Sequence, residues 1–197
     1  MSARHLVADR SGSSAAEFGM VLPLLILLLL GVLDAGRFIW EYNRAEKATA
    51  AGARVAIVTD VVAGGLSSTN YVGTVVGGVT LTQGDLIPAA ALPTVTCTRT
   101  TCTPATGTVD SAAFDRIVER MQFMKPDIAA TNVEVQYSGS GLGYAGNPNG
   151  MDINPLVTVK LTGLQYSPLI LFGFIPFNMP DFRTTLTAED SAGTESN

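Results

Sequence analysis

The sequence has very few of the side chains on which most catalytic and metal sites depend. It contains one histidine, His5, and two cysteines, Cys97 and Cys102, among 197 residues. Because that histidine lies near the N-terminus, the rest of the chain cannot form a Ser-His or Cys-His nucleophile pair. Two cysteines without further soft ligands are too few for a structural zinc site. We therefore expect no catalytic, cofactor-binding or metal-binding residues, and we predict that the protein is not an enzyme.

Charge is also scarce in this chain. Only 15% of the residues are charged, and 12 Lys and Arg against 17 Asp and Glu give a formal net charge of -5. A nucleic-acid partner would require a basic surface to neutralise phosphates, so none is expected, and no small-molecule substrate is expected either. Hydrophobic residues make up 47% of the chain, whereas soluble domains carry roughly 25% charged residues. Part of the chain is therefore suited to an apolar medium.

The apolar residues are concentrated near the N-terminus, in the run FGMVLPLLILLLLGVL that ends at Leu33. A helix over residues 13–33 would be about 31 Å long, which matches the hydrocarbon core of a bilayer. Trp40 and Tyr42 follow, and such amphipathic aromatic side chains are typical of the membrane–water interface. The sequence therefore predicts one transmembrane helix over residues 13–40.

The charges of the first residues predict how this helix is oriented. Residues 1–12 carry Arg4 and Arg10 against Asp9, and short segments rich in Lys and Arg stay on the cytoplasmic side. We therefore expect a single pass through a bacterial inner membrane. Residues 1–12 would lie in the cytoplasm and the chain after residue 40 in the periplasm.

Small residues stand before the apolar run rather than after it. A cleavable secretory signal would need a small-x-small site after the run, where Asp34 stands instead. The string GSSAAEF, from Gly12 to Phe18, resembles the processing site of type IV prepilins of the Flp class. The resemblance implies that a prepilin peptidase cuts after Gly12, on the cytoplasmic face. Ser13 would then be the first residue of the mature chain and Glu17 the fifth.

Glu17 would lie in or near hydrocarbon, where an ionised carboxylate costs on the order of 2–4 kcal/mol. Such a charge is expected to have a partner. Cleavage would create a new α-ammonium group at Ser13, and the ammonium of a neighbouring subunit could neutralise Glu17 during assembly. The alternative is that Glu17 only caps the cytoplasmic end of the helix, where a negative charge suits the helix dipole.

The resemblance extends along residues 12–56. Its further motif positions, in order after the apolar run, are Gly36, Asn43, Gly52 and Arg54. Together they resemble the TadE-like segment of minor pseudopilins from the tight-adherence (Tad/Flp) pilus system. The resemblance implies a pilus assembly protein that contributes to Flp-type pili and surface adherence. The implied partners are the inner membrane, the prepilin peptidase, other pilins or pseudopilins, and the Tad assembly machinery.

The residues after the apolar run also carry their own structural prediction. Asp34 and Arg37 are three residues apart, so on a helix they could form an ion pair at the outer membrane boundary. Residues 41–60 are predicted to continue as a membrane-proximal helix with small side chains on one face. That face would allow other helices to approach closely, or it would pack on the chain's own exported domain, and both could hold along different turns of one long helix.

Residues 61–197 are predicted to form a small exported α+β domain with a mostly antiparallel sheet. Residues 111–125 have the apolar spacing of an amphipathic helix, whereas residues 132–137 and 155–164 alternate as strands do. Cys97 and Cys102 flank a four-residue turn and could close a disulfide in an oxidising compartment, the alternative being two free thiols. Residues 164–180 are apolar but interrupted by Pro and Gly, and we expect a loop that covers the core or faces a partner.

Two short motifs in the exported part could suggest ligand sites. The string Gly141–Gly146 fits the dinucleotide pattern G-x-G-x-x-G, but the turn residues NPNG follow it instead of a helix. Asn147, Asn149 and Asp152 could offer oxygen ligands to calcium, but they lack the spaced carboxylates of a calcium loop. Two functions therefore remain: a minor pseudopilin, or a single-pass anchored envelope protein with a binding domain.

Overall fold

The computed structural model describes residues 13–148, 150–169 and 175–189. The chain divides into two compact units: the first comprises residues 1–41 and 165–177, and the second comprises residues 42–164 and 178–197. A long N-terminal helix and antiparallel sheets place the described chain in the α+β class. The predicted fold class is confirmed.

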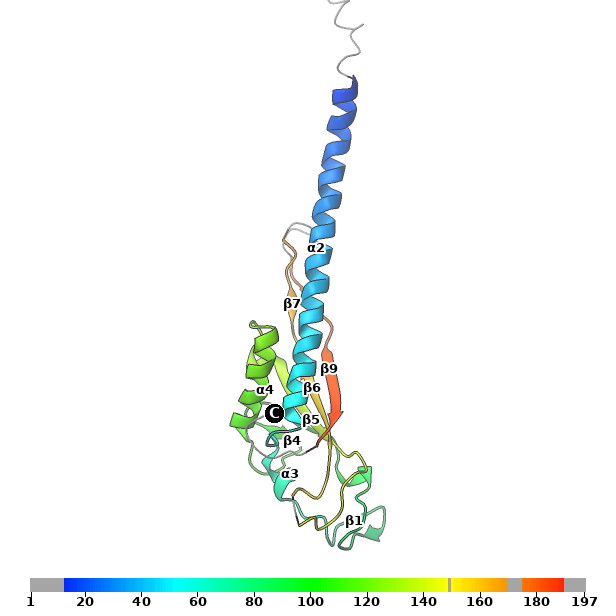
Figure 1. The fold of residues 1–197 in the computed structure, drawn as a ribbon, viewed down its shortest axis with the longest axis vertical. Helices are drawn as coiled ribbons and strands as arrows, with labels where there is room; N and C mark the ends of the chain where they lie inside the picture. Colours follow the sequence, from blue (N-terminus) through cyan, green and yellow to red (C-terminus); the bar gives the residue numbers. More distant parts are fainter. Residues whose placement is uncertain (1–12, 149, 170–174, 190–197) are drawn as a thin grey trace, which may run out of the picture. The chain divides into compact units, whose positions relative to one another are not determined.

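The helix α2 (Ser13–Ala56) runs without interruption for 44 residues and contains Pro23 (Figure 1). Its length is about 66 Å at the usual rise per residue, so it contributes its first part to the first unit and its last turns to the second. It ends four residues before the predicted residue 60. Beyond Ala56 the backbone N–H groups of Ile57 and Thr59 still donate to the carbonyls of Ala53 and Val55, at 3.2 and 3.1 Å, and the Thr59 hydroxyl donates to the same Val55 carbonyl at 2.9 Å.

The second unit is built on a five-stranded antiparallel sheet with the strand order β4-β3-β5-β6-β9. The strands are β3 (Val95–Cys97), β4 (Cys102–Thr103), β5 (Val133–Ser138), β6 (Leu156–Leu161) and β9 (Phe182–Thr187). Along β5 and β6 every second residue is buried. One face of the sheet therefore forms the core and the other is polar, as the alternating sequence predicts.

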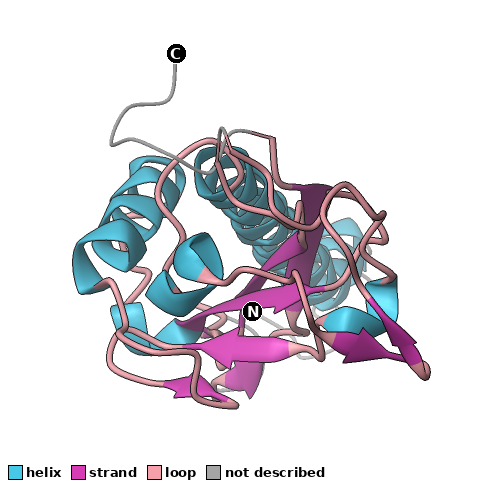
Figure 2. Cartoon of the chain, turned by 90° about the horizontal axis from the view of Figure 1, so that it is seen from below, coloured by secondary structure: helices cyan, strands magenta, loops and turns pink. Residues whose placement is uncertain are grey.

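The helix α4 (Ser111–Met124) covers the apolar face of this sheet together with the last turns of α2. Asp110 caps α4, because its side chain accepts the backbone N–H of Ala113 at 2.9 Å. The apolar face of α4 is buried, and Figure 2 shows helices over one side of the strands. At the core, the buried hydroxyl of Tyr137 accepts the backbone N–H of Val62 at 2.9 Å.

Shorter elements complete both units. In the second unit they are α3 (Gly64–Ser68), β1 (Val75–Val76), β2 (Val79–Thr80), η1 (Ala89–Ala91) and η2 (Ala130–Asn132). Cys97 and Cys102 are joined by a disulfide between paired positions of β3 and β4. The strands β7 (Gln165–Tyr166) and β8 (Phe177–Asn178) pair with each other. They lie within the segment that was expected to be a loop.

Small residues on the last turns of α2 let α4 approach closely. Ala45, Ala48 and Ala53 are completely buried in the second unit. A Cβ added at Gly52 would lie 2.7 Å from Cγ of Met121, which is closer than van der Waals contact allows. On these turns the small-residue face is therefore used by the chain's own domain, as one of the two possibilities predicts, whereas close approach of other helices along different turns stays a prediction.

We expect Gly52→Val to lower the free energy of unfolding by about 1–3 kcal/mol, because the new methyl groups would force Met121 out of a packed core. The measurement is urea unfolding of the detergent-solubilised chain, followed by near-ultraviolet circular dichroism. Gly36→Val is the matched control, since no atom lies within 4 Å of a Cβ at that position. Equal stability of the two variants would contradict the packing role of Gly52.

Candidate functional site

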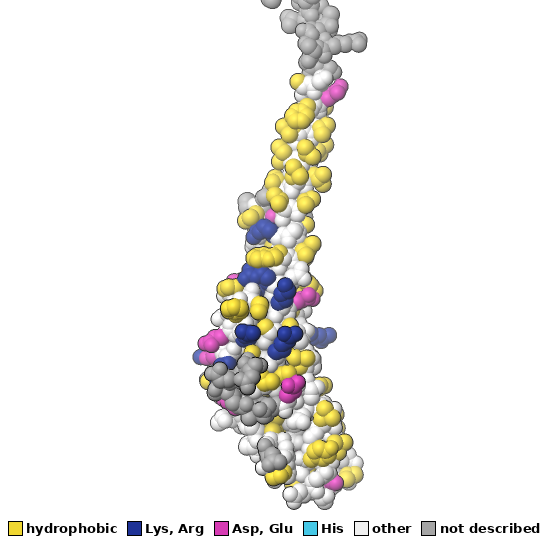
Figure 3. Space-filling model, in the orientation of Figure 1, with side chains coloured by type: hydrophobic (Ala, Val, Ile, Leu, Met, Phe, Trp, Pro, Cys, Tyr) yellow, Lys and Arg dark blue, Asp and Glu magenta, His cyan; other side chains and the backbone are white. Residues whose placement is uncertain are grey.

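The first part of α2 presents apolar side chains on all sides. Met20 is 77% exposed and Leu24 is 70% exposed, and Figure 3 shows yellow side chains along this part of the helix. Among the described residues, α2 is the one helix long and apolar enough to cross a membrane. A helix that is hydrophobic all round and uncovered by its own chain fits a lipid environment.

The residues of the predicted processing site lie at the start of this helix. Ser13 is the first residue of α2, and Glu17 and Phe18 are exposed on its surface. Gly12 and the rest of the predicted leader lie outside the described residues. Glu17 is therefore presented by a regular helix, one turn after Ser13.

Asp34 and Arg37 contact the β7–β8 hairpin of the first unit rather than each other. Asp34 is 5% exposed. Its Oδ1 accepts the backbone N–H of Leu169 at 3.1 Å, and its backbone carbonyl accepts the hydroxyl of Tyr166 at 2.9 Å. The Arg37 guanidinium lies over the Tyr166 ring, 5.9 Å from its centroid. The predicted Asp34–Arg37 ion pair is not among the salt bridges of the described residues, because both side chains turn toward the hairpin.

An aromatic cluster fixes the hairpin to α2 just beyond Asp34. The ring of Phe38 lies 5.3 Å from that of Tyr166 and 5.6 Å from that of Phe177, measured between centroids. Tyr166 and Phe177 are themselves 5.4 Å apart. Tilted and edge-to-face contacts of this kind stabilise a packed cluster beyond simple area burial. The sequence analysis did not identify Tyr166 and Phe177 as contacts of α2. Their position near the two ends of the uncharged segment 164–180 could have indicated such a contact.

The four motif positions of α2 have different surroundings. Gly36 and Asn43 are exposed, and nothing lies within 4 Å of a Cβ added at Gly36. Gly52 is packed against α4, as described above, and Arg54 is exposed on the last turn. Of the four positions, Gly52 therefore serves the packing of the second unit, whereas no described residue packs against the position that a Cβ would take at Gly36.

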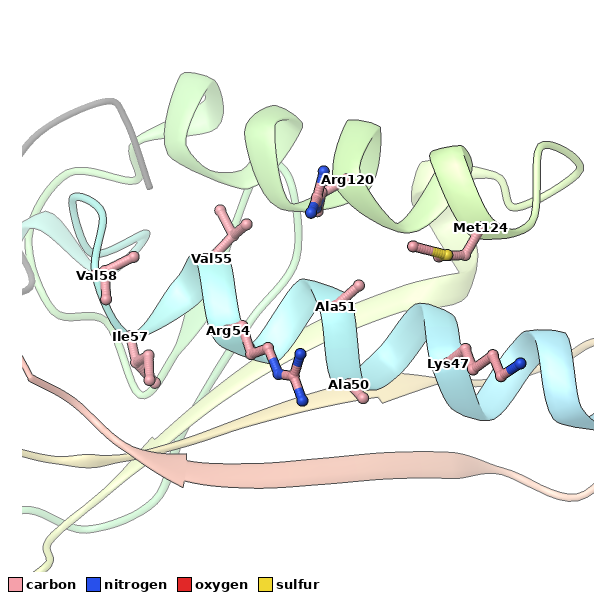
Figure 4. A pocket seen from close by; sticks show the side chains of 9 residues that line it. All are labelled: Lys47, Ala50, Ala51, Arg54, Val55, Ile57, Val58, Arg120 and Met124. Atoms are coloured by element: carbon pink, nitrogen blue, oxygen red, sulfur yellow. The ribbon is translucent and has the colours of Figure 1, made fainter. Parts of the chain in front are cut away.

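Arg54 lines a groove of about 510 Å³ between α2 and α4 in the second unit (Figure 4). The groove has an apolar floor and three cationic side chains. Its lining residues are Lys47, Ala50, Ala51, Arg54, Val55, Ile57, Val58, Arg120 and Met124. Arg120 belongs to α4, where its guanidinium lies over the Phe123 ring, 5.8 Å from the centroid, and the other two cations project from α2 (Figure 4). Chemically, the cations and apolar side chains among its described lining residues suit an acidic group attached to an apolar body.

The loop that carries the dinucleotide-like string is a turn stabilised by Asp152. Gly143 has a φ of 109°, and a Cβ there would lie 2.2 Å from the Asp152 carbonyl oxygen. Gly143 pairs with Ile153 as an isolated β-bridge. No described helix begins after the string Gly141–Gly146. The string therefore lacks the helix N-terminus that would hold a pyrophosphate.

The carboxylate of Asp152 is used by the backbone. It accepts the N–H groups of Tyr71 at 2.8 Å, Gly146 at 2.9 Å and Asn147 at 2.8 Å. Burial by itself raises the pKa of Asp152, but these three donors outweigh it and hold the pKa below its usual range. Asn149, the third candidate calcium ligand, lies outside the described residues. The geometry assigns Asp152 to loop stability.

We expect Asp152→Asn to lower the free energy of unfolding by about 1–3 kcal/mol, because one buried and two partly buried N–H donors would lose a charged acceptor. The folded pKa lies below the unfolded value of about 3.9. The contribution is therefore fully present above the unfolded pKa and is lost as the pH falls through the folded pKa. Urea unfolding at neutral pH should show a lower free energy of unfolding for Asp152→Asn than for the unmodified chain. This difference should shrink in strong acid.

Asp85→Asn is the control for this prediction. The Asp85 carboxylate is exposed and accepts hydrogen bonds only from Thr82, within its own turn, among the described residues. We expect a much smaller loss of stability there. If the amide hydrogen exchange of Tyr71, Gly146 and Asn147 were unchanged in Asp152→Asn, the role of this carboxylate in holding the loop would be disproved.

The comparisons with known proteins point to the same N-terminal segment. Residues 12–54 match the family model described as TadE-like protein. No curated protein and no solved structure matches the chain. The match begins at Gly12, continues through the exposed part of α2 and ends on its last turns, so it contains all four motif positions. The resemblance inferred from the sequence is confirmed for this segment: residues 12–54 are similar to the TadE-like family of the Tad pilus system.

Proposed function

We propose that this chain is a minor pseudopilin of a Tad (Flp-type) pilus system, which is cut after Gly12 and contributes to pilus biogenesis and surface adherence. The observation that carries the proposal is the TadE-like match over residues 12–54. That match coincides with a helix whose apolar part is not buried by the rest of the described chain. The function is one of anchoring and assembly, and it requires no catalytic group.

The surface of α2 supports assembly with other helices in the membrane. No atom lies within 4 Å of a Cβ added at Gly19 or Gly36, so neither glycine is required by the packing of its own chain. Small residues on a lipid-exposed helix allow the backbone of another helix to approach closely. Glu17 is exposed on this surface, where a carboxylate can be neutralised by the ammonium group of a neighbouring subunit.

The proposed orientation places residues 1–12 in the cytoplasm and the second unit in the periplasm. The charges of residues 1–12 support it through the positive-inside rule. The disulfide between Cys97 and Cys102 supports it as well, because disulfides persist in the oxidising periplasm and are rare in the cytosol. The proposed partners are the inner membrane, the prepilin peptidase, other pilins or pseudopilins, and the Tad assembly machinery.

The test of the proposed function is cleavage of the leader. Intact mass and N-terminal sequencing should show Ser13 as the first residue in cells with prepilin peptidase, and Met1 in cells without it. Gly12→Leu should block the cut, whereas Gly19→Leu, a matched change seven positions later, should not. A chain that retains Met1, or is cut after Ala35, would favour the other function, a non-pilus envelope protein anchored by one helix.

A second prediction concerns Glu17. If its carboxylate pairs with the α-ammonium of a neighbouring subunit, Glu17→Gln should leave membrane insertion and folding intact but reduce piliation. Insertion can even improve, because a neutral amide costs less in hydrocarbon than a carboxylate. Piliation is counted by electron microscopy, and membrane insertion is measured by carbonate extraction. The matched control is Glu46→Gln, an exposed glutamate in the second unit. Normal piliation of the Glu17 variant would leave only the capping role.

A further inference from the structure

We infer that the hairpin of the first unit, residues 165–169 and 175–177, is a second membrane contact that binds the phospholipid surface beside α2. The inference rests on α2 crossing a membrane in the proposed orientation, and it does not depend on cleavage of the leader or on pilus assembly. It replaces the expectation of a core-covering or partner-facing loop for residues 164–180. The ligand of this surface is lipid at the outer boundary of the bilayer that α2 crosses.

The contacts to α2 set the depth of the hairpin. Leu169 and Tyr166 hydrogen-bond to Asp34, and Tyr166 and Phe177 pack on Phe38. From Glu17 to Asp34 the helix rises about 26 Å, close to the roughly 30 Å thickness of a hydrocarbon core. With Glu17 at the cytoplasmic boundary, the hairpin therefore meets α2 at the level of the outer boundary.

The hairpin presents large apolar side chains, beside the exposed but uncharged Gln165 and Ser167. Leu169 is 51% exposed, Ile175 is 68% exposed and Phe177 is 44% exposed. The sequence between Lys160 and Asp181 contains no charged residue. Several large apolar side chains exposed on one short, uncharged segment suggest a surface that does not face water.

The polar groups at the base of the hairpin are paired within the first unit. The hydroxyl of Tyr166 donates to Asp34, the Asp34 carboxylate accepts a backbone N–H, and the Arg37 guanidinium lies over an aromatic ring. Satisfying a carboxylate and a backbone N–H in this way lowers the cost of placing them near hydrocarbon. Tyrosine and arginine side chains each have an apolar part and a polar end, so both suit a membrane interface.

Continuity with α2 decides between lipid and a protein partner. The exposed apolar residues of the hairpin adjoin the helix surface around Asp34 and Phe38, and the neighbouring Leu33 and Ile39 on that helix are 60% and 59% exposed. Both surfaces therefore require the same apolar surroundings at the same depth. A bilayer that surrounds α2 supplies these surroundings without any further component.

The single tryptophan of the chain, Trp40, makes a direct test feasible. In a Trp40→Phe background, Ile175→Trp or Leu169→Trp places one fluorophore on the hairpin. The full chain is reconstituted into phosphatidylcholine vesicles, with or without bromine atoms high on the acyl chains. Acrylamide in the buffer is the aqueous quencher. The control is Val79→Trp in the same background, at a residue of the second unit that is 64% exposed.

We expect the hairpin tryptophans to lose most of their emission in the brominated vesicles and to resist acrylamide, as Trp40 of the unmodified chain should do. Val79→Trp should behave in the opposite way. Two results would overturn the inference. Quenching by acrylamide to the level of the Val79 control would place the hairpin in water. Protection from both quenchers would place it under protein, which favours a partner subunit. Because two hairpin positions are tested, misfolding of one variant does not remove the test.

Discussion

The continuity of α2 is the constraint on which the rest of this structure depends. One helix of 44 residues has an apolar, uncovered part in one unit and a buried small-residue face in the other. The two environments require opposite side chains, because lipid favours large apolar residues on all sides whereas close packing against α4 favours alanine and glycine. The change from leucine to alanine along the helix satisfies both requirements without a break in the backbone.

Asp34 lies where these two environments meet. A carboxylate on an otherwise apolar stretch is costly unless its charge or its lone pairs are engaged. The chain engages it with a backbone N–H from a residue 135 positions later. The C-terminal part of the sequence thus returns to the boundary of the apolar helix and stabilises a polar group there. The hairpin and Asp34 depend on each other, since Leu169 donates to the carboxylate and Tyr166 donates to the carbonyl of the same residue.

Sequence periodicity predicted those elements whose buried face appears in the sequence as a regular spacing of apolar residues. The helix α4 and the strands β5 and β6 were predicted to within one residue at each end, except that the predicted β6 runs three residues too far, because each has one buried face and therefore a clear period of 3.6 or 2. The partner of Asp34 could not be predicted in this way. An ion pair with Arg37 satisfies local spacing, but the hairpin offers a hydrogen bond from a distant part of the chain, and no pattern within residues 34–37 contains that information.

The glycines of α2 show why a shared motif does not have a single physical meaning. Gly52 is required because a Cβ would meet Met121 at 2.7 Å, whereas a Cβ at Gly36 would meet no atom within 4 Å. In a helix each glycine costs about 1 kcal/mol relative to alanine. At position 52 the close approach of α4 offsets that cost within the chain. At position 36 nothing in the described chain offsets it, so the benefit has to come from outside. Under the proposed function another helix at close range would supply that benefit, because such a contact gains most from the missing side chain.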